Sequence, residues 1–243
     1  MSNDKGTTDQ TLILAIETAT RAGGVTVARG ETVLETISGD ASISHSTNLL
    51  EMIDGALRKA GVLLADIELF AVASGPGSFT GLRIGLATAK AFAVHLRREV
   101  IGVSTLAAVA HASKLDGNIV ALLPAGRGEV FAQRFTLREG IVAPVDEPQH
   151  LGPNAVREKY AAVEALQFAG DGVPLVKNSI DDSETISFAS ESPILAPSIA
   201  VLGYRAYQEG KAVPPENLQA VYVRASDAEI NERWQKQQQP ANQ

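Results

Sequence analysis

Short apolar runs alternate with helix-like patterns along this chain, and that alternation restricts it to an α/β architecture. The first hundred residues predict, in order, strands at 11–16, 25–28 and 32–37, a helix at 49–60, a strand at 67–73, a helix at 80–96 and a strand at 99–103. Ser46 and Thr47 are N-cap candidates for the first helix, and Gly61 ends it. The first strand is apolar at almost every position, as expected for a strand buried on both faces.

The same order of elements begins again after a helix predicted from 104 to about 114. The second series comprises strands at 118–123, 129–137 and 140–148, a helix at 153–160, a strand at 166–169, a polar irregular stretch at 178–192 and a helix at 197–210. We therefore expect two related α/β domains, at 1–104 and 105–223. Residues 224–243 are rich in Gln, Asn, Lys and Glu, which is typical of a disordered tail.

Charge and composition argue against several classes of function. The 243 residues include 21 Lys plus Arg and 28 Asp plus Glu, and the net charge of −7 argues against a chain that itself grips nucleic acid. The absence of cysteine excludes disulfides, thiolate zinc sites, iron–sulfur clusters and a cysteine nucleophile. No stretch approaches the roughly 20 apolar residues of a membrane span. Residues 1–10 lack the pattern of a secretory signal, so we expect a soluble, cytoplasmic protein.

The sharpest local motif is a glycine loop between a buried strand and a helix. Its residues are Gly75, Pro76, Gly77, Ser78, Phe79, Thr80, Gly81 and Arg83. Free N–H groups at such a helix start can bind an anion, with help from a nearby guanidinium. The alternative interpretation is structural: Gly75 and Gly77 supply positive φ for a tight turn, and Ser78 or Thr80 caps the helix. The loop is not a P-loop, because no Gly-Lys-Ser/Thr follows it.

The helix at 80–96 is unusually apolar, with only Arg83, Thr88, Lys90 and His95 strongly polar. A helix that is apolar on all sides is expected to be buried on all sides. Small residues recur every four positions, at Gly81, Gly85, Ala89 and Ala93, and form a strip that another helix could approach closely. Either the domain's own first helix covers this strip, or a partner protein does.

Other candidate sites carry weaker signals. Glu17 stands at the carboxyl end of the first strand, where α/β folds often place a functional carboxylate, but no second carboxylate has a spacing that would pair with it. The Gly-Asp-Gly at 170–172 fits a turn better than a nucleotide loop. His45 has Leu49 one helical turn later, so the spacing supplies one metal ligand and not two.

Five segments together carry a resemblance to a known family. They are LAIETAT at 14–20, SGPGSFTGLRIG at 74–85, IGVSTL at 101–106, RGEVF at 127–131 and AVYVR at 220–224. With these motifs the chain resembles the bacterial TsaB (YeaZ) family over roughly residues 11 to 225. The resemblance implies the actin-like, sugar-kinase and Hsp70-type (ASKHA) fold, with two related α/β domains.

The resemblance also implies a non-catalytic role. Family members support synthesis of threonylcarbamoyladenosine beside the tRNA anticodon: the paralogue TsaD transfers the group, TsaB binds and stabilises TsaD, and the ATPase TsaE joins them. Alone, such proteins form homodimers through the same helical face. We therefore expect an accessory subunit with no catalytic residues, no metal and no cofactor of its own, which meets tRNA only indirectly. Whether ATP or ADP binds at the subunit interface is left open.

Partner contacts are expected from the first two helices of the N-terminal domain. The expected residues are Leu50, Ile53, Leu82, Gly85, Leu86, Ala89, Phe92 and Ala93. If they form the interface, replacing Ala89 and Ala93 by Arg abolishes pairing and leaves a folded monomer.

Two enzymatic alternatives remain open: a small-molecule kinase or ATPase of the same fold, and a glycoprotease-like metallopeptidase. Family relatives often carry Asp at the end of the first strand and another near Arg127, where this chain has Glu17 and Pro124, which argues against ATP hydrolysis by this chain alone. The catalytic paralogue holds its metal with two histidines one helical turn apart, whereas His45 is followed by Leu49, and no HExxH motif occurs.

Overall fold

The structure is a computed structural model that describes residues 11–40, 42, 45–180, 186–189 and 194–223. The described residues form a five-stranded sheet and a six-stranded sheet. The first contains β1 (Leu12–Glu17), β2 (Gly24–Arg29), β3 (Thr32–Ser38), β4 (Leu69–Gly75) and β5 (Glu99–Ser104), in the order β3-β2-β1-β4-β5. β1 pairs antiparallel with β2 and parallel with β4, so it lies at the centre of the sheet.

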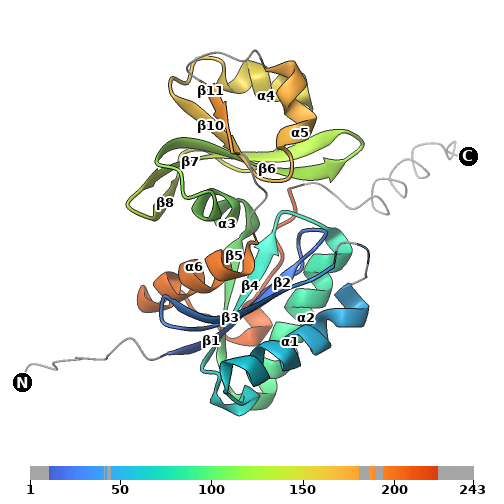
Figure 1. Cartoon of the computed structure of the whole chain (residues 1–243), viewed down its shortest axis with the longest axis vertical. Helices are drawn as coiled ribbons and strands as arrows, with labels where there is room; N and C mark the ends of the chain where they lie inside the picture. The colour runs from blue at the N-terminus through green and yellow to red at the C-terminus, as the bar shows by residue number, and fades with distance from the viewer. Residues whose placement is uncertain (1–10, 41, 43–44, 181–185, 190–193, 224–243) are drawn as a thin grey trace, which may run out of the picture.

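Helices cover both faces of this sheet. α1 (His45–Ala60) and α2 (Phe79–Leu96) lie side by side on one face, and α6 (Ala196–Gln208) lies on the other (Figure 1). Every residue of β1 is therefore buried, which explains its continuous apolar sequence. On α1, the positions Leu49, Ile53, Ala56 and Leu57 face the sheet, and α1 ends at Gly61 with a φ of 68° as predicted.

The second sheet repeats the topology of the first. It contains β6 (Gly117–Gly126), β7 (Glu129–Arg138), β8 (Ile141–Pro144), β10 (Leu166–Ala169) and β11 (Ile186–Phe188), in the order β11-β10-β6-β7-β8, and β9 (Gln149–Leu151) pairs with β7. As in the first sheet, an antiparallel meander adjoins parallel strands. The repeated element order that the sequence predicts is confirmed.

Side chains on β6 alternate between two cores. Ile119, Ala121 and Leu123 belong to the large core that also contains the first sheet, whereas Val120 and Leu122 pack with α4 (Pro153–Tyr160) and α5 (Val173–Val176). α3 (Thr105–Ala112) contacts β6, β7 and α6, so it lies between the two sheets. We call the first sheet with α1, α2 and α6 the first lobe, and the second sheet with α4 and α5 the second lobe.

The C-terminal helix returns to the first lobe. α6 contacts β1, β2, β4 and β5, and Gly203 of α6 lies so close to β4 that a Cβ there would come within 2.6 Å of the Ala71 side chain. The division at residues 104 and 105 remains a prediction, but α6, which follows residue 194, packs on the first sheet. The predicted disordered tail at 224–243 lies outside the described residues.

Two predicted segments differ from the structure. The strand expected at 140–148 forms only at its start, as β8, and β9 begins after the predicted range. Between them Asp146 accepts a hydrogen bond from the Arg134 backbone N–H (2.7 Å) and another from the Tyr160 hydroxyl (3.0 Å). The stretch at 178–192, expected to be irregular, contains β11, whose Phe188 ring stacks on Phe168 with centroids 5.7 Å apart.

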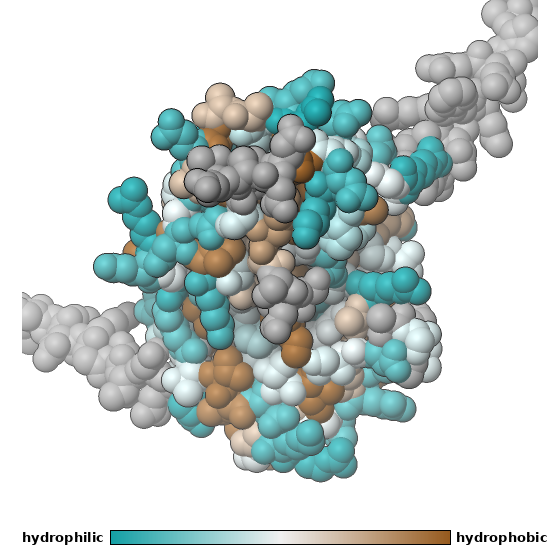
Figure 2. Space-filling model, turned by 45° about the horizontal axis from the view of Figure 1, so that its top comes forward, coloured by the Kyte–Doolittle hydropathy of each residue, from teal (hydrophilic) through white to brown (hydrophobic). Residues whose placement is uncertain are grey.

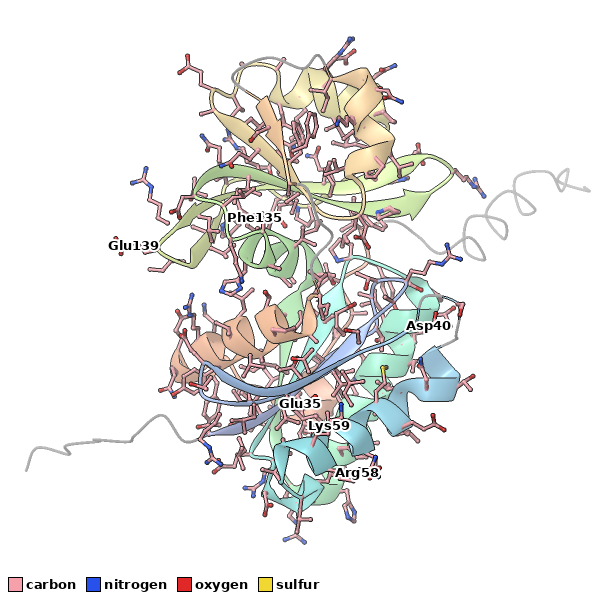
Figure 3. The ribbon with its side chains drawn as sticks, in the orientation of Figure 1. Glu35, Asp40, Arg58, Lys59, Phe135 and Glu139 are labelled. Carbon is pink, nitrogen blue, oxygen red and sulfur yellow. The ribbon has the colours of Figure 1, made fainter. Side chains whose placement is uncertain are left out.

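The surface of the molecule carries both hydrophobic and hydrophilic groups. On the face shown in Figure 2, hydrophobic groups form several small clusters among hydrophilic ones. Charged side chains also link elements locally, as between Lys59 of α1 and Glu35 of β3 at 3.6 Å (Figure 3). No helix in the described part of the chain is long and apolar enough to cross a membrane.

Candidate functional site

The glycine loop joins β4 to α2 and is held by the segment that follows β1. Ser78 is the N-cap of α2, and its Oγ accepts a hydrogen bond from the Gly81 N–H at 3.2 Å. The Ser78 N–H donates to the Ala19 carbonyl at 2.8 Å. The capping role predicted for Ser78 is confirmed, and these two N–H groups are already bonded within the chain, which weakens the anion-binding alternative.

Close packing, more than turn geometry, explains the glycines. Gly75 has a φ of 118°, as predicted, but Gly77 does not have positive φ, so that part of the prediction is wrong. A Cβ on Gly77 would instead lie 2.6 Å from the Ala19 carbonyl oxygen. At Gly81 it would overlap with the Thr18 carbonyl, and at Gly85 with Thr18 Oγ1. The loop and the first turns of α2 therefore fit tightly around residues 18–19.

An aromatic cluster covers the outer side of the loop. The Val221 N–H donates to the Ser74 carbonyl at 2.7 Å, which brings Tyr222 against Phe79 with ring centroids 5.2 Å apart. The Arg83 guanidinium lies over the Phe79 ring at 3.8 Å. Residues near the C-terminus thus close a loop from the middle of the chain, and only the AVYVR motif gives any sequence signal for this contact.

Most of the predicted partner-binding residues are buried within the chain itself. Ile53, Leu82, Gly85, Leu86, Ala89 and Ala93 all belong to the buried interior, and Phe92 is half-buried with its ring 6.1 Å from that of Phe70. The assignment of these residues to a partner surface is therefore wrong for this conformation. The small-residue strip of α2 faces Thr18 and β4 of its own lobe.

The opposite side of α2 is exposed, so the expectation that this helix is buried on all sides is also wrong. Arg83, Ala87, Ala91 and Val94 are all exposed, and Val94 retains 64% of its surface. On α1, the predicted residue Leu50 is also 64% exposed. Because α1 and α2 lie side by side on one face of the sheet, their exposed stripes both point away from it.

A cavity of about 120 Å³ lies between the lobes. It is lined by Glu17, Thr20, Ala22, Gly23, Ser38, Val109, Leu123, Gly170, Asp171, Ile194 and Leu195. Ligand pockets usually measure about 300–1,000 Å³. Among the described residues that line this one, the charges come from the carboxylates Glu17 and Asp171, and no Lys, Arg or His is present. The charged groups of the lining are thus of the same sign as the phosphates of a nucleotide and do not favour them.

Glu17 itself is held within the loop after β1. It is buried, and its two carboxylate oxygens accept hydrogen bonds from the Thr20 N–H (2.8 Å) and the Thr20 hydroxyl (2.6 Å). Across the cavity, Gly170 has a φ of 102°, and a Cβ there would overlap with the Leu122 carbonyl. The turn interpretation of residues 170–172 is confirmed. Pro124, the other departure from the family pattern, is an exposed residue of β6 opposite Val130.

The histidines do not gather into one site. His111 Nδ1 lies 2.9 Å from Ser198 Oγ, His150 Nε2 lies 2.8 Å from a Glu129 carboxylate oxygen, and His95 is exposed near the end of α2. The side chain of His45 lies outside the described residues. Within the described part of the chain, no group of three or more His, Asp or Glu residues could hold a metal ion.

Comparison with known proteins identifies the family. The sequence profile of the family described as "TsaD: tRNA N6-adenosine threonylcarbamoyltransferase" matches residues 36–193. A protein of Escherichia coli named "tRNA threonylcarbamoyladenosine biosynthesis protein TsaB" is 30% identical over 87% of this chain and 94% of its own length. The chain belongs to the TsaB (YeaZ) family. The Bacillus subtilis protein of the same name is 28% identical over 91% of this chain and 97% of its own length.

A solved structure of this family supports the fold. The structure described as "YeaZ from Pseudomonas aeruginosa" is 28% identical, covers 88% of this chain and all of its own, and superposes with a TM-score of 0.75. The expected ASKHA-type fold with two related α/β lobes is confirmed. Family membership thus rests on whole-chain similarity as well as on the glycine-loop motif.

Proposed function

We propose that this chain is a non-catalytic accessory subunit in tRNA threonylcarbamoyladenosine biosynthesis. We further propose that a docking face, formed by the exposed residues Leu50, Ala87, Ala91 and Val94, binds a TsaD-like catalytic subunit. The names of the E. coli and B. subtilis relatives place those proteins in this biosynthesis. The match to the TsaD profile over residues 36–193 means that the proposed partner is a related chain. A related chain would present a corresponding pair of helices, and helices with small apolar side chains pack closely against one another.

The exposed apolar stripe of α2 is the observation that carries this proposal. Ala87 and Ala91 leave a smooth surface, and Val94 and Leu50 add exposed branched side chains on either helix. Arg83 and the half-exposed Tyr222 lie at the N-terminal end of the stripe, and both residue types are enriched in binding hot spots. In the absence of its partner, a second copy of the chain would use the same face, and a TsaE-like ATPase would join the assembled pair.

The inter-lobe cavity supports a role without turnover. A small-molecule kinase of this fold would have to place a nucleotide between the lobes, where the cavity measures about 120 Å³ and its charged lining groups are carboxylates. Both oxygens of Glu17 are already bonded to Thr20. We therefore expect the isolated chain to show no magnesium-dependent nucleotide hydrolysis. Micromolar nucleotide binding with turnover by the purified chain would favour the kinase or ATPase alternative.

Complex formation in size-exclusion chromatography tests the docking face. Ala91→Arg and Val94→Arg change exposed residues, so both variants should fold, and both should fail to co-elute with the TsaD-like subunit. Ala161→Arg is the matched control, because Ala161 is also exposed at a helix end but lies on the second lobe after α4. A stable complex with both docking-face variants would refute the assignment.

A further inference from the structure

One guanidinium connects three separate parts of the chain. Arg205 on α6 donates from Nε to Glu31 Oε1 at 2.7 Å, from Nη2 to Glu31 Oε2 at 2.8 Å and from Nη1 to the Gly140 carbonyl at 2.6 Å. The pair with Glu31 is bidentate, which is the strongest and most directional form of a charge-assisted hydrogen bond. The hydrogen bond from Arg205 holds the pKa of Glu31 below its usual value, so the carboxylate stays charged in this contact.

The two partners of Arg205 belong to different lobes. Glu31 lies in the turn between β2 and β3 of the first sheet, and Gly140 lies in the turn between β7 and β8 of the second. Both turns lie at the left of the molecule in Figure 1, and Figure 3 labels Glu139, the residue before Gly140, at that edge. Gly140 has a φ of 75°, which lets its carbonyl face the guanidinium at the tip of the turn.

The remaining connections between the lobes are more central. α3 packs against α6, β4 and β5, and apolar side chains of both sheets share one core around it. His111 of α3 meets Ser198 of α6 at 2.9 Å. The chain passes between the lobes where β5 leads into α3 and again between β11 and α6. These central contacts hold the two lobes together, but they resist rotation of one lobe relative to the other less well. A contact at the outer edge lies farther from the axis of such a rotation and therefore resists it more effectively.

We propose that Arg205 is a latch that fixes the angle between the two lobes by holding Glu31 and Gly140 together. With the latch formed, the molecule is one rigid body, and the cavity between Glu17 and Asp171 stays narrow. Without it, the second lobe pivots about the α3–α6 contact. Lysine cannot replace arginine here, because a single ammonium cannot make the bidentate pair and reach the carbonyl in the same geometry.

Distances between spin labels on the two lobes test the latch. The chain has no cysteine, so Glu51→Cys on α1 and Glu158→Cys on α4 provide two unique, exposed attachment points. Double electron–electron resonance should give one narrow distance distribution for this doubly labelled chain. Arg205→Gln should broaden the distribution and shift its maximum, and Arg205→Lys should give an intermediate result.

The matched control removes a neighbouring ion pair that does not join the lobes. Lys211 pairs with Glu209 just after α6, and both are well exposed, so Lys211→Gln should leave the distribution unchanged. The proposal is overturned if Arg205→Gln gives the same distribution as Lys211→Gln. If Arg205→Gln does not fold, Glu31→Gln tests the proposal instead. This change keeps an oxygen acceptor but removes the charge, and it should broaden the distance distribution and shift its maximum in the direction expected for Arg205→Gln.

Discussion

The fit between Gly85 of α2 and Thr18 can be tested with a double-mutant cycle. A Cβ on Gly85 would overlap with Thr18 Oγ1, which donates a hydrogen bond to the Gly81 carbonyl at 2.7 Å. The next neighbours of that Cβ would be Thr18 Cβ at 3.5 Å and an Ile16 methyl at 3.6 Å, which are ordinary contacts. Thr18→Ala removes the hydroxyl and should therefore make room for Gly85→Ala.

The expected free energies follow from these contacts. Gly85→Ala gains about 1 kcal/mol of helix propensity but overfills the site at a cost of about 1–3 kcal/mol, so the net loss is about 1 kcal/mol. Thr18→Ala loses about 1 kcal/mol for its hydrogen bond and about 1 kcal/mol for its buried methyl group. In the double variant the change at position 85 gains helix propensity without the overlap, so the free energy of unfolding falls by about 1 kcal/mol relative to the unchanged chain. If the two single effects were additive, the double variant would instead lose about 3 kcal/mol.

Urea unfolding followed by circular dichroism measures all four free energies of unfolding. The double variant should be more stable than Thr18→Ala alone, with a coupling energy of about 2 kcal/mol. Ala87→Gly is the control: Ala87 is exposed on the same helix, so that change should cost about 1 kcal/mol whether or not Thr18 is present. Additivity of Thr18→Ala and Gly85→Ala within about 0.5 kcal/mol would refute the close packing of α2 against Thr18.

Further predictions concern burial and protonation. Ala89 is fully buried, so Ala89→Arg should prevent folding or cost more than about 4 kcal/mol in unfolding experiments, whereas Ala91→Arg should change stability by about 0.5 kcal/mol or less. Burial, with help from Arg205, lowers the pKa of His111 in the folded state. The unfolded chain therefore binds that proton more readily, and stability should fall as pH drops below about 6.5, an effect that His111→Gln should remove from a melting-temperature series. Tyr160→Phe loses the hydroxyl bond to Asp146 and should cost about 1 kcal/mol, measured by urea unfolding.

Local patterns were sufficient for most of the architecture. α4 and β10 have the predicted bounds, because Pro153 starts the helix and a turn at 170–172 follows the strand. The duplicated order of strands and helices also emerged from apolar periodicity. The prediction of an irregular stretch at 178–192 is wrong at β11, where three residues form a strand only because β10 lies beside them.

The orientation of α2 could not be read from its own residues. Both the buried strip with Gly85 and Ala89 and the exposed stripe with Ala87 and Ala91 consist of small side chains, so composition does not separate them. What decides the buried side is the contact with Thr18, which lies 63 residues from Gly81 in the chain. The pairing of Glu31 with Arg205 spans 174 residues and has no local signal at all.

Reconstitution of the tRNA modification from purified components tests the central claim most directly. Formation of threonylcarbamoyladenosine by TsaD-like and TsaE-like subunits should fall strongly when this chain is omitted, and Val94→Arg should be no better than omission, whereas Ala161→Arg should restore full activity. Full modification with Val94→Arg, or without the chain, would contradict a docking subunit that acts through the exposed face of α1 and α2.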